Sequence, residues 1–199
     1  ADAEVFALIR EGLSPLSLRA ATGDMGLLLA AVRGLKTTDR RKAALLRHIW
    51  RPRRFRALLD RFAGRAPLPE GREAMLAKDD PMQDAGPQIG LRSASEIAAR
   101  IAGLRQDAAS APISAQEVEL LDDLLALRET TVNVLEHLRD IAVDMPAIAS
   151  AVDRLEARAE ALAKRGVDVA ALDFEGSYGR TSMEYYDGFV FGFYAETRP

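Results

Sequence analysis

Two adjacent tyrosines near the C-terminal end of the chain are the residues best suited to bind a small polar ligand. Tyr185 and Tyr186 are framed by Glu184 and Asp187. A tyrosine offers an apolar ring face and a hydroxyl that can donate and accept hydrogen bonds. We expect one of the two rings to face the core and the other to face a pocket. The alternative interpretation is that both tyrosines are packing residues at the edge of a sheet.

A strand that follows the tyrosines is predicted to position them. Phenylalanine occupies every second position from Phe189 to Phe193, and alternate residues of a strand share one face. A second strand is predicted over residues 172–178, with residues 179–182 as the turn. We expect the two strands to pair as an antiparallel hairpin, surrounded by a mainly helical region between about residues 23 and 166.

The tyrosine motif resembles a known family. Residues 183–191 are similar to the histidine-recognition motif of histidyl-tRNA synthetases, which has the form Leu-Asp-Tyr-Tyr-Thr-Gly-x-Val-Phe. With Ser-Tyr-Gly-Arg-Thr-Ser before it and Gly-Phe-Tyr-Ala after it, the segment more closely resembles the regulatory subunits of ATP phosphoribosyltransferase. These are catalytically silent paralogues of the synthetase that act in the first step of histidine biosynthesis. Residues 2–29 are similar to the family just after its second class-defining motif.

One departure from the synthetase pattern bears on catalysis. The synthetases carry an arginine five residues before the second tyrosine, where it helps to form the adenylate. In this chain that position, counted back from Tyr186, is Thr181, and the nearest arginine is Arg180. A shift of one residue in a strand turns a side chain to the opposite face. The departure therefore favours the regulatory paralogue over the synthetase.

The resemblance implies an α+β fold, a fragment of a class II aminoacyl-tRNA synthetase-like domain with few antiparallel strands and a mainly helical middle. Residues 1–35 and 167–199 would form parts of the synthetase-like core, and residues 36–166 a helical insertion or flanking region. Because the chain begins inside a helical pattern and stops straight after a strand, we expect it to be part of a longer protein. The parts with motif one and motif two would lie upstream, and a Gly-Gly-Arg-Tyr-Asp element downstream.

The resemblance also implies a function, that of a non-catalytic regulatory subunit. Such a protein activates the short catalytic subunit of ATP phosphoribosyltransferase and conveys feedback inhibition by L-histidine. Tyr186 would line the imidazole, with Tyr185 and Glu184 as neighbours, and no catalytic residue, metal or cofactor is expected. The expected partners are the catalytic subunit, L-histidine and a second copy of the chain, as a homodimer within a hetero-oligomer. The alternatives are a histidyl-tRNA synthetase fragment and a helical interaction module that does not bind histidine.

Composition narrows the choice of function. The chain has 199 residues, 48% of them hydrophobic, and a formal net charge of -3. A negative chain is a poor partner for nucleic acid, because phosphate binding needs a basic surface. The absence of cysteine excludes thiolate zinc sites and cysteine nucleophiles, and two histidines make a histidine-rich metal site unexpected. No apolar run approaches the roughly 18 residues of a membrane span, so we expect a cytoplasmic protein without a membrane partner.

Two further segments allow a functional and a structural interpretation. Residues 47–56 are strongly basic and could form an anion site, a surface for an acidic partner or a contact for RNA. They could equally be a solvated helix face whose arginine stems cover Trp50 and Phe55. Residues 23–26 form a Gly-x-x-Gly turn between a predicted strand over 16–22 and a helix. Such a turn can cradle a phosphate or serve only as scaffold.

Helix signals are clear over the rest of the chain. Residues 2–13 form an amphipathic pattern, and residues 38–63 are helical with a break near Pro52. Capping boxes begin at Ser93 and Ser114. The apolar face predicted for the first helix consists of Val5, Leu8, Ile9 and Leu13.

Two more helices are predicted before the C-terminal strands, over residues 131–143 and 146–165, and Gly166 is expected to end the second. In that second helix the charged side chains recur one turn apart. We expect them to form a solvated face with intrahelical pairs. They are Arg154, Glu156, Arg158 and Glu160.

Overall fold

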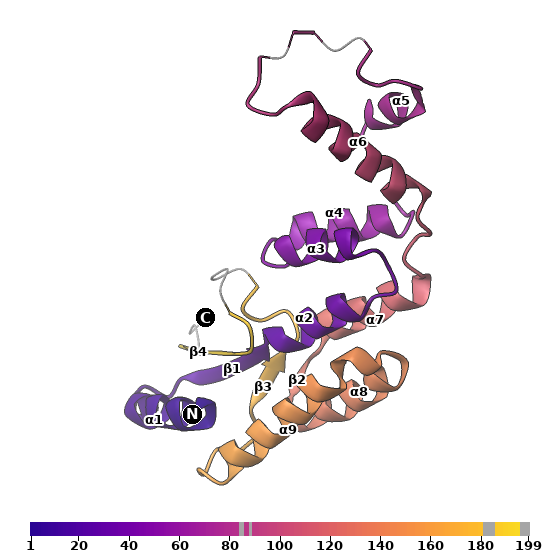
Figure 1. Ribbon diagram of the computed structural model, residues 1–199. Coiled ribbons are helices and arrows are strands. Elements are labelled where there is room, and N and C mark those ends of the chain that lie inside the picture. Colours follow the sequence, from indigo (N-terminus) through magenta and orange to yellow (C-terminus); the bar gives the residue numbers. More distant parts are fainter. Residues whose placement is uncertain (84–85, 88, 181–185, 196–199) are drawn as a thin grey trace.

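The computed structural model describes residues 1–83, 86–87, 89–180 and 186–195 (Figure 1). Its helices surround one small sheet and run in the order α1 (Asp2–Leu13), α2 (Met25–Gly34), α3 (Asp39–Arg47), α4 (Pro52–Phe62), α5 (Arg72–Ala77), α6 (Ala94–Ala109), α7 (Ala115–Ala126), α8 (Thr131–Asp144) and α9 (Ala149–Ala163). Two short 3-10 helices, η1 (Ser14–Leu16) and η2 (Pro146–Ile148), follow α1 and α8. Within the described residues, no helix is both long enough and apolar enough to cross a bilayer.

The sheet has four strands in the order β2 (Arg128–Thr130), β3 (Asp173–Glu175), β1 (Arg19–Asp24) and β4 (Phe189–Tyr194). The strand β1 is parallel to β3 and antiparallel to β4, and β2 is antiparallel to β3. The sheet is therefore mixed, inside the α+β class that the sequence predicts.

The predicted hairpin between residues 172–178 and Phe189 to Phe193 is wrong, because β1 lies between the two strands. The six residues of β1 all pair with the six residues of β4, whereas β3 has only three residues. Beyond Glu175 the chain turns instead of continuing as a strand, and the amide of Tyr178 donates to the Glu175 carbonyl at 3.0 Å. The longer ladder with β1 thus decides the pairing of β4.

The phenylalanine face of β4 is covered by α1. The ring of Phe6 lies 5.1 Å from that of Phe191 and 5.4 Å from that of Phe193, measured between centroids. The predicted inward face of this helix is wrong, because Val5, Leu8 and Ile9 are exposed while Phe6 is fully buried. The sheet offers aromatic rings as the partner surface, and the helix turns its one aromatic side chain towards them.

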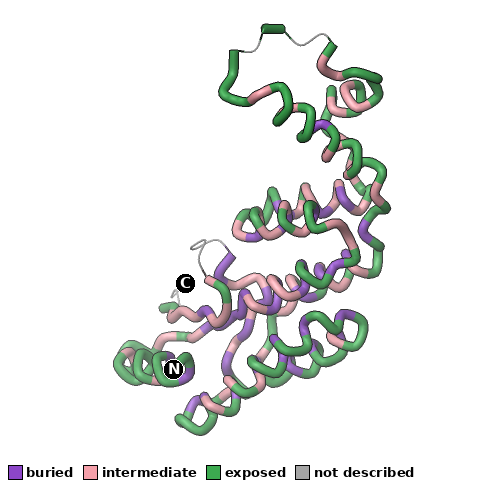
Figure 2. The backbone as a smooth tube through the Cα atoms, in the orientation of Figure 1, coloured by how far each residue is buried: buried purple, intermediate pink, exposed green. Residues whose placement is uncertain are grey.

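The main hydrophobic core lies around α2, where α3, α4, α7, α8, η2 and α9 supply its walls. Buried residues concentrate in this central region and become sparse towards α5 and α6 (Figure 2). The helix α2 is apolar on most sides, with Leu28, Ala31 and Val32 inaccessible to solvent. A helix with such a sequence is expected at the centre of a core.

The helices α5 and α6, with the segment between them, project from the rest of the molecule (Figure 1). One buried arginine of α3 joins this arm to the body. The Arg41 Nε donates to Asp107 Oδ1 at 2.6 Å, and its other nitrogens donate to the carbonyl oxygens of Asp107, Ser110 and Ala111. One guanidinium group thus donates hydrogen bonds to carbonyl oxygens in the last turn of α6 and in the two residues that follow it.

Most helix boundaries agree with the sequence signals. The helix α3 ends at Arg47 and α4 begins at Pro52, which confirms the predicted break. Both predicted capping boxes are present, at Ser93 and Ser114. The short strand β2 was not predicted.

The charged side chains of α9 are only partly a solvated face. Arg158 is mostly buried and its Nη1 donates to Asp24 Oδ2 at 2.6 Å, while its guanidinium lies 4.6 Å from the centroid of the Phe189 ring. Glu156 pairs with Arg139 of α8. The expectation of intrahelical pairs is therefore wrong for Arg158 and Glu156, because neighbouring elements place opposite charges within reach.

Candidate functional site

Of the three residues predicted to bind histidine, the structure describes Tyr186. Tyr185 and Glu184 lie outside the described residues. The side chain of Tyr186 is half-buried and packs against the main core. One ring of the tyrosine pair thus contacts apolar packing while remaining partly accessible from outside.

Two other tyrosines lie on the face of the sheet opposite the phenylalanines. The hydroxyl groups of Tyr178 and Tyr194 are hydrogen-bonded to each other, and their rings meet edge to face with centroids 6.4 Å apart. Burial raises the pKa of Tyr178, and the hydrogen bond to Tyr194 adds to the effect. Glu175 and Tyr186 raise this pKa further through their charges. Tyr178 therefore stays a neutral donor and acceptor far above neutral pH.

Glycines allow this tyrosine to lie against the sheet. A β-carbon at Gly23 would lie 2.6 Å from the β-carbon of Tyr178, and one at Gly192 would collide with the Tyr178 hydroxyl. Because Ala21 pairs with Gly192 and Gly23 pairs with Val190, these positions share one face of the β1–β4 ladder. Small residues in both strands thus make the space that Tyr178 fills.

Arg180 turns away from the sheet towards the turn between α3 and α4. Its Nε donates to the Ile49 carbonyl at 2.9 Å, and its guanidinium lies 4.9 Å from the centroid of the Phe55 ring. Only 6% of this residue is exposed. Phe55 is therefore covered by Arg180, and not only by arginine stems of its own segment as the sequence suggested.

The Gly-x-x-Gly turn at residues 23–26 binds one of its own carboxylates. Asp24 precedes α2, and its Oδ1 accepts a hydrogen bond from the Gly26 amide at 2.7 Å. The other oxygen accepts from Arg158. A carboxylate thus occupies the place where a phosphate would bind at a helix N-terminus. The geometry favours the interpretation of this turn as scaffold.

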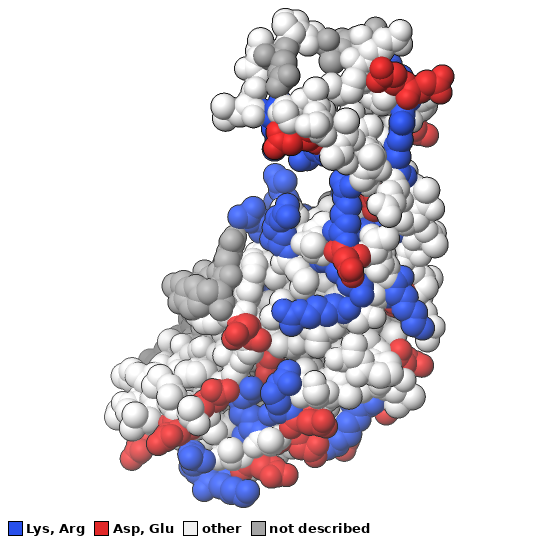
Figure 3. Space-filling model, viewed as in Figure 1, with Lys and Arg blue, Asp and Glu red and all other residues white. Residues whose placement is uncertain are grey.

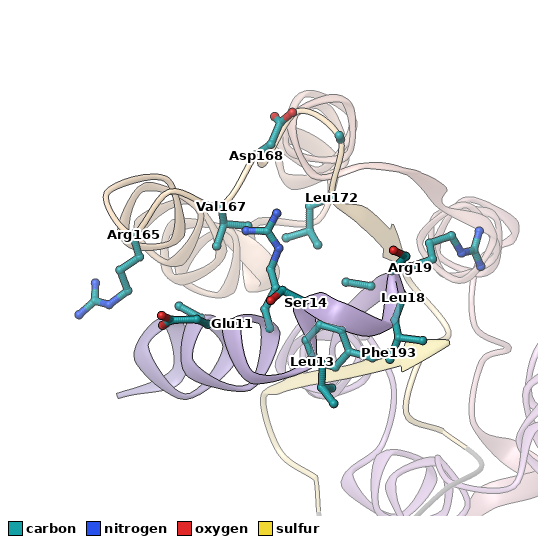
Figure 4. Close-up of a pocket in the computed structure, with 15 residues that line it drawn as sticks. Glu11, Leu13, Ser14, Leu18, Arg19, Arg165, Val167, Asp168, Leu172 and Phe193 are labelled. Atoms are coloured by element: carbon teal, nitrogen blue, oxygen red, sulfur yellow. The ribbon is translucent and has the colours of Figure 1, made fainter. Parts of the chain in front are cut away.

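A cavity of about 710 Å³ lies where β1 begins and β4 ends, between α1 and residues 165–172 (Figure 4). Phe193 and Leu172 supply apolar surface, and Arg165 and Asp168 supply charges of both signs. The mixed lining gives no preference for one ligand charge. The structure brings neither Tyr186 nor Arg180 to this cavity.

The described part of the chain offers no cluster of three or more histidine, aspartate or glutamate side chains that could hold a metal ion. His137 lies 3.7 Å from Glu129 and is half-exposed. His137 is therefore a surface residue of α8.

Comparison with known proteins agrees with the motif. The family model described as histidyl-tRNA synthetase matches residues 91–199. A protein of Brucella anthropi named ATP phosphoribosyltransferase regulatory subunit is 27% identical over 95% of this chain and 54% of its own length. A protein of the same name from Brucella canis is 32% identical over 64% of this chain and 36% of its own length. The chain thus spans about half or less of the length of these curated relatives.

A solved structure gives the same result at the level of the fold. It is described as an ATP phosphoribosyltransferase regulatory subunit/histidyl-tRNA synthetase from Bacillus halodurans, and it matches with a TM-score of 0.56 at 19% identity. The match covers 99% of this chain and 39% of the other. The mixed sheet with its surrounding helices is therefore a class II synthetase-like fold.

Because the family model covers more than half of its residues, the chain belongs to the histidyl-tRNA synthetase family. Among its members, the curated relatives confirm the resemblance to the regulatory subunits of ATP phosphoribosyltransferase.

Several residues around the candidate site have no counterpart in the sequence-based prediction. Tyr178 and Tyr194 flank the motif, but the sequence does not reveal their contact, because Tyr178 lies in the turn after β3 and Tyr194 lies in β4, on the other side of β1. The pairing of Asp24 with Arg158 was also missed, because the two residues are 134 positions apart in the sequence. Only the small residues at Gly23 and Gly192 could have indicated a close approach.

Proposed function

We propose that the full-length protein is a non-catalytic regulatory subunit of ATP phosphoribosyltransferase. In this proposal it activates the short catalytic subunit in the first step of histidine biosynthesis and conveys inhibition by histidine, in the cytoplasm. The names of the relatives from Brucella anthropi and Brucella canis support this role. The family model and the solved structure support the synthetase-like frame on which it rests.

The position of Arg180 is the observation that carries the non-catalytic part of the proposal. A synthetase needs a guanidinium beside the second tyrosine to stabilise the adenylate. Five residues before Tyr186 this chain has a threonine, and Arg180 is bonded to the Ile49 carbonyl and stacked on Phe55. Bringing this guanidinium back to the sheet would break both interactions. The contacts of Arg180 thus favour binding without activation.

The amino-acid site proposed for this function is formed by Tyr186, with Tyr185 and Glu184 beside it. A half-buried tyrosine ring suits an imidazole, because it supplies an apolar face and a polar hydroxyl at once. The residues 1–35 and 167–199 would form the parts of the core that hold this site. Residues 36–166 would form the mainly helical insertion or flanking region, although β2 from this region also joins the sheet. The active assembly would contain the chain as a homodimer within the hetero-oligomer.

Mixing the full-length protein with a short catalytic subunit tests the regulatory role. Phosphoribosyl transfer should rise on mixing and fall when L-histidine is added. The effect is allosteric only if histidine binds the inhibited assembly more tightly than the active one. If the rate does not rise on mixing, the regulatory role is refuted.

A substitution at Tyr186 tests the amino-acid site separately. The Tyr186→Phe protein loses one hydroxyl but keeps the ring, so we expect histidine to bind about tenfold more weakly, equivalent to about 1.4 kcal/mol. Tyr194→Phe is the matched control, since Tyr194 is bonded to Tyr178. Isothermal titration of both variants with histidine gives the affinities. Equal affinities in wild type and Tyr186→Phe would exclude a role for the hydroxyl.

The second candidate function is histidine activation by a histidyl-tRNA synthetase, which the description of the family model favours. Histidine-dependent exchange of pyrophosphate into ATP by the full-length protein distinguishes the two. We expect no exchange above the background without histidine. A clear exchange rate would establish the synthetase instead.

A further inference from the structure

A cationic pocket lies between the first turns of α4 and the segment that follows β3. It has a volume of about 580 Å³, and its lining includes Arg53, Phe55, Arg56, Ser177 and Arg180. Basic side chains gather over α3 and α4 on the face of the molecule shown in Figure 3. The proposed regulatory function does not use this pocket.

Arg180 is the buried cation of the pocket. Its Nε is bonded to the Ile49 carbonyl, but its Nη2 is buried and has no hydrogen-bond partner among the described residues. Burial lowers the pKa of Arg180 to about 10, and the neighbouring Arg56 contributes to the shift. A buried guanidinium nitrogen without an acceptor is unusual, because leaving a charged donor unpaired is costly.

Comparison with Arg41 shows how this chain satisfies a buried guanidinium when it can. Arg41 is as buried as Arg180, with 5% against 6% exposed. Its three nitrogens donate to a carboxylate and to three backbone carbonyls. Arg180 has one carbonyl and one aromatic ring in place of this set. An acceptor from outside the described chain is what the Arg180 site lacks.

The start of α4 adds a second source of positive potential. This helix has 11 residues, begins at Pro52 and has no side-chain hydrogen bond at its N-cap. The first residues of α4, including Arg53, line the pocket. A helix N-terminus attracts anions through its amide groups and its dipole.

The acidic groups near the pocket are mostly engaged by Arg56. This side chain is bonded to Asp122, and its Nη1 also lies 3.7 Å from Asp60 Oδ1. Asp60 is a lining residue, whereas Asp122 is not. The two carboxylates thus offset the charge of Arg56. Neither of them is paired with Arg53 or Arg180, the other two cations that line the pocket.

We propose that this pocket binds a small anion, a carboxylate or phosphate group, with Arg180 as the buried donor and Arg53 and the start of α4 at the rim. Planar guanidinium groups hold both kinds of oxyanion through paired hydrogen bonds. Ser177 also lines the pocket. An anion site here agrees with one of the interpretations of the basic segment 47–56, because Arg53 and Arg56 of this segment line the pocket.

Titration of the full-length protein with inorganic phosphate and, separately, with acetate tests the proposal at constant ionic strength set with chloride. We expect at least one anion to bind with a dissociation constant in the millimolar range or below. The Arg180→Met protein, which keeps the length of the side chain, should bind it at least tenfold more weakly, and Arg53→Gln a few-fold more weakly. Tighter binding of phosphate would indicate a phosphorylated ligand, and tighter binding of acetate a carboxylate.

The matched control is Arg139→Gln, because Arg139 is an exposed arginine paired with Glu156 on α9. Its affinity should equal that of the wild type. Equal binding by wild type and Arg180→Met, or no binding of either anion, would overturn the proposal. If Arg180→Met does not fold, the NMR resonance of the Arg180 Nε–H group in the wild-type protein provides the test. An anion bound in the pocket must shift this resonance, and an unchanged resonance on addition of the anion refutes the site. These experiments need no catalytic subunit and no histidine, so their outcome is independent of the regulatory role.

Discussion

Replacing Arg41 with methionine should lower the free energy of unfolding, because Arg41 joins the α5–α6 arm to the body. In the Arg41–Asp107 pair the arginine is buried and the aspartate is mostly buried, with 7% and 17% of the side chains exposed. Removing one partner of a buried ion pair costs about 3–5 kcal/mol, because the other charge stays desolvated. Asp107 retains some access to water, so we expect a value near about 3 kcal/mol.

The carbonyl oxygens at the end of α6 contribute to the same loss. Those of Asp107, Ser110 and Ala111 accept from Arg41 at 2.6, 3.3 and 2.7 Å. Each would have to find water or stay unsatisfied in the Arg41→Met protein. Hydrogen exchange should therefore accelerate in α6 more than in α2, which has no part in this contact.

Urea unfolding of the full-length protein, followed by circular dichroism, measures the effect. Arg139→Met is the control, since the Arg139–Glu156 pair is half-exposed and such pairs contribute about 0–1 kcal/mol. A double variant, Arg41→Met with Asp107→Leu, should recover part of the loss because no unpaired charge remains. A cost below about 1 kcal/mol for Arg41→Met, or one equal to that of the control, would show that this contact does not hold the arm to the body.

Three further outcomes follow from single contacts. Gly176→Ala should lower the free energy of unfolding by about 1–3 kcal/mol, because a β-carbon there would collide with the Leu124 carbonyl oxygen. Gly12→Ala is the control and should stabilise α1 slightly, because a β-carbon at that position would lie in open space. Urea unfolding of both variants measures the two effects, and equal effects would contradict the prediction. Tyr178→Phe should lose less stability at high pH than the wild type. The pKa of Tyr178 is raised in the folded state, so its contribution to stability is complete below the ordinary tyrosine pKa of about 10 and disappears as the pH rises beyond that value. The prediction is contradicted if the urea midpoint falls equally in both proteins between pH 8 and pH 10.5. Ser114→Ala should cost about 1 kcal/mol through the lost cap of α7, and an unchanged thermal midpoint would contradict it.

The local elements could be predicted from the sequence because their signals are local. Proline at position 52 ends one helix and begins the next, and Ser93 and Ser114 begin helices through contacts three residues away. The pairing of strands could not be predicted in this way. The small residues of β1 show no strong alternation, and nothing in the motif around Tyr186 indicates that a strand 165 positions earlier completes its ladder.

The binding role of the candidate site residues stays a prediction, and the orientation of the side chains around them could not be predicted from the sequence. Counting back from Tyr186 places a threonine where the synthetases carry an arginine, but it does not give the direction of the Arg180 guanidinium, because Arg180 lies in a turn and not in a strand. Its destination, the Ile49 carbonyl, depends on how α3 and α4 meet, and that packing leaves no mark within the motif. The face of α1 was predicted incorrectly for a similar reason, since a periodic pattern identifies an apolar side without identifying the surface that covers it.

The position of β1 within the sheet has a consequence for biosynthesis. Both of its hydrogen-bonded neighbours, β3 and β4, are synthesised only after residue 172. Its two edges therefore stay open while the helices α2 to α9 are synthesised, and closing so long a loop delays the ladder further. An unpaired strand is a site for intermolecular association. Translation stalled before residue 172 should thus yield chains that aggregate or recruit chaperones, while release beyond residue 194 lets the ladder close.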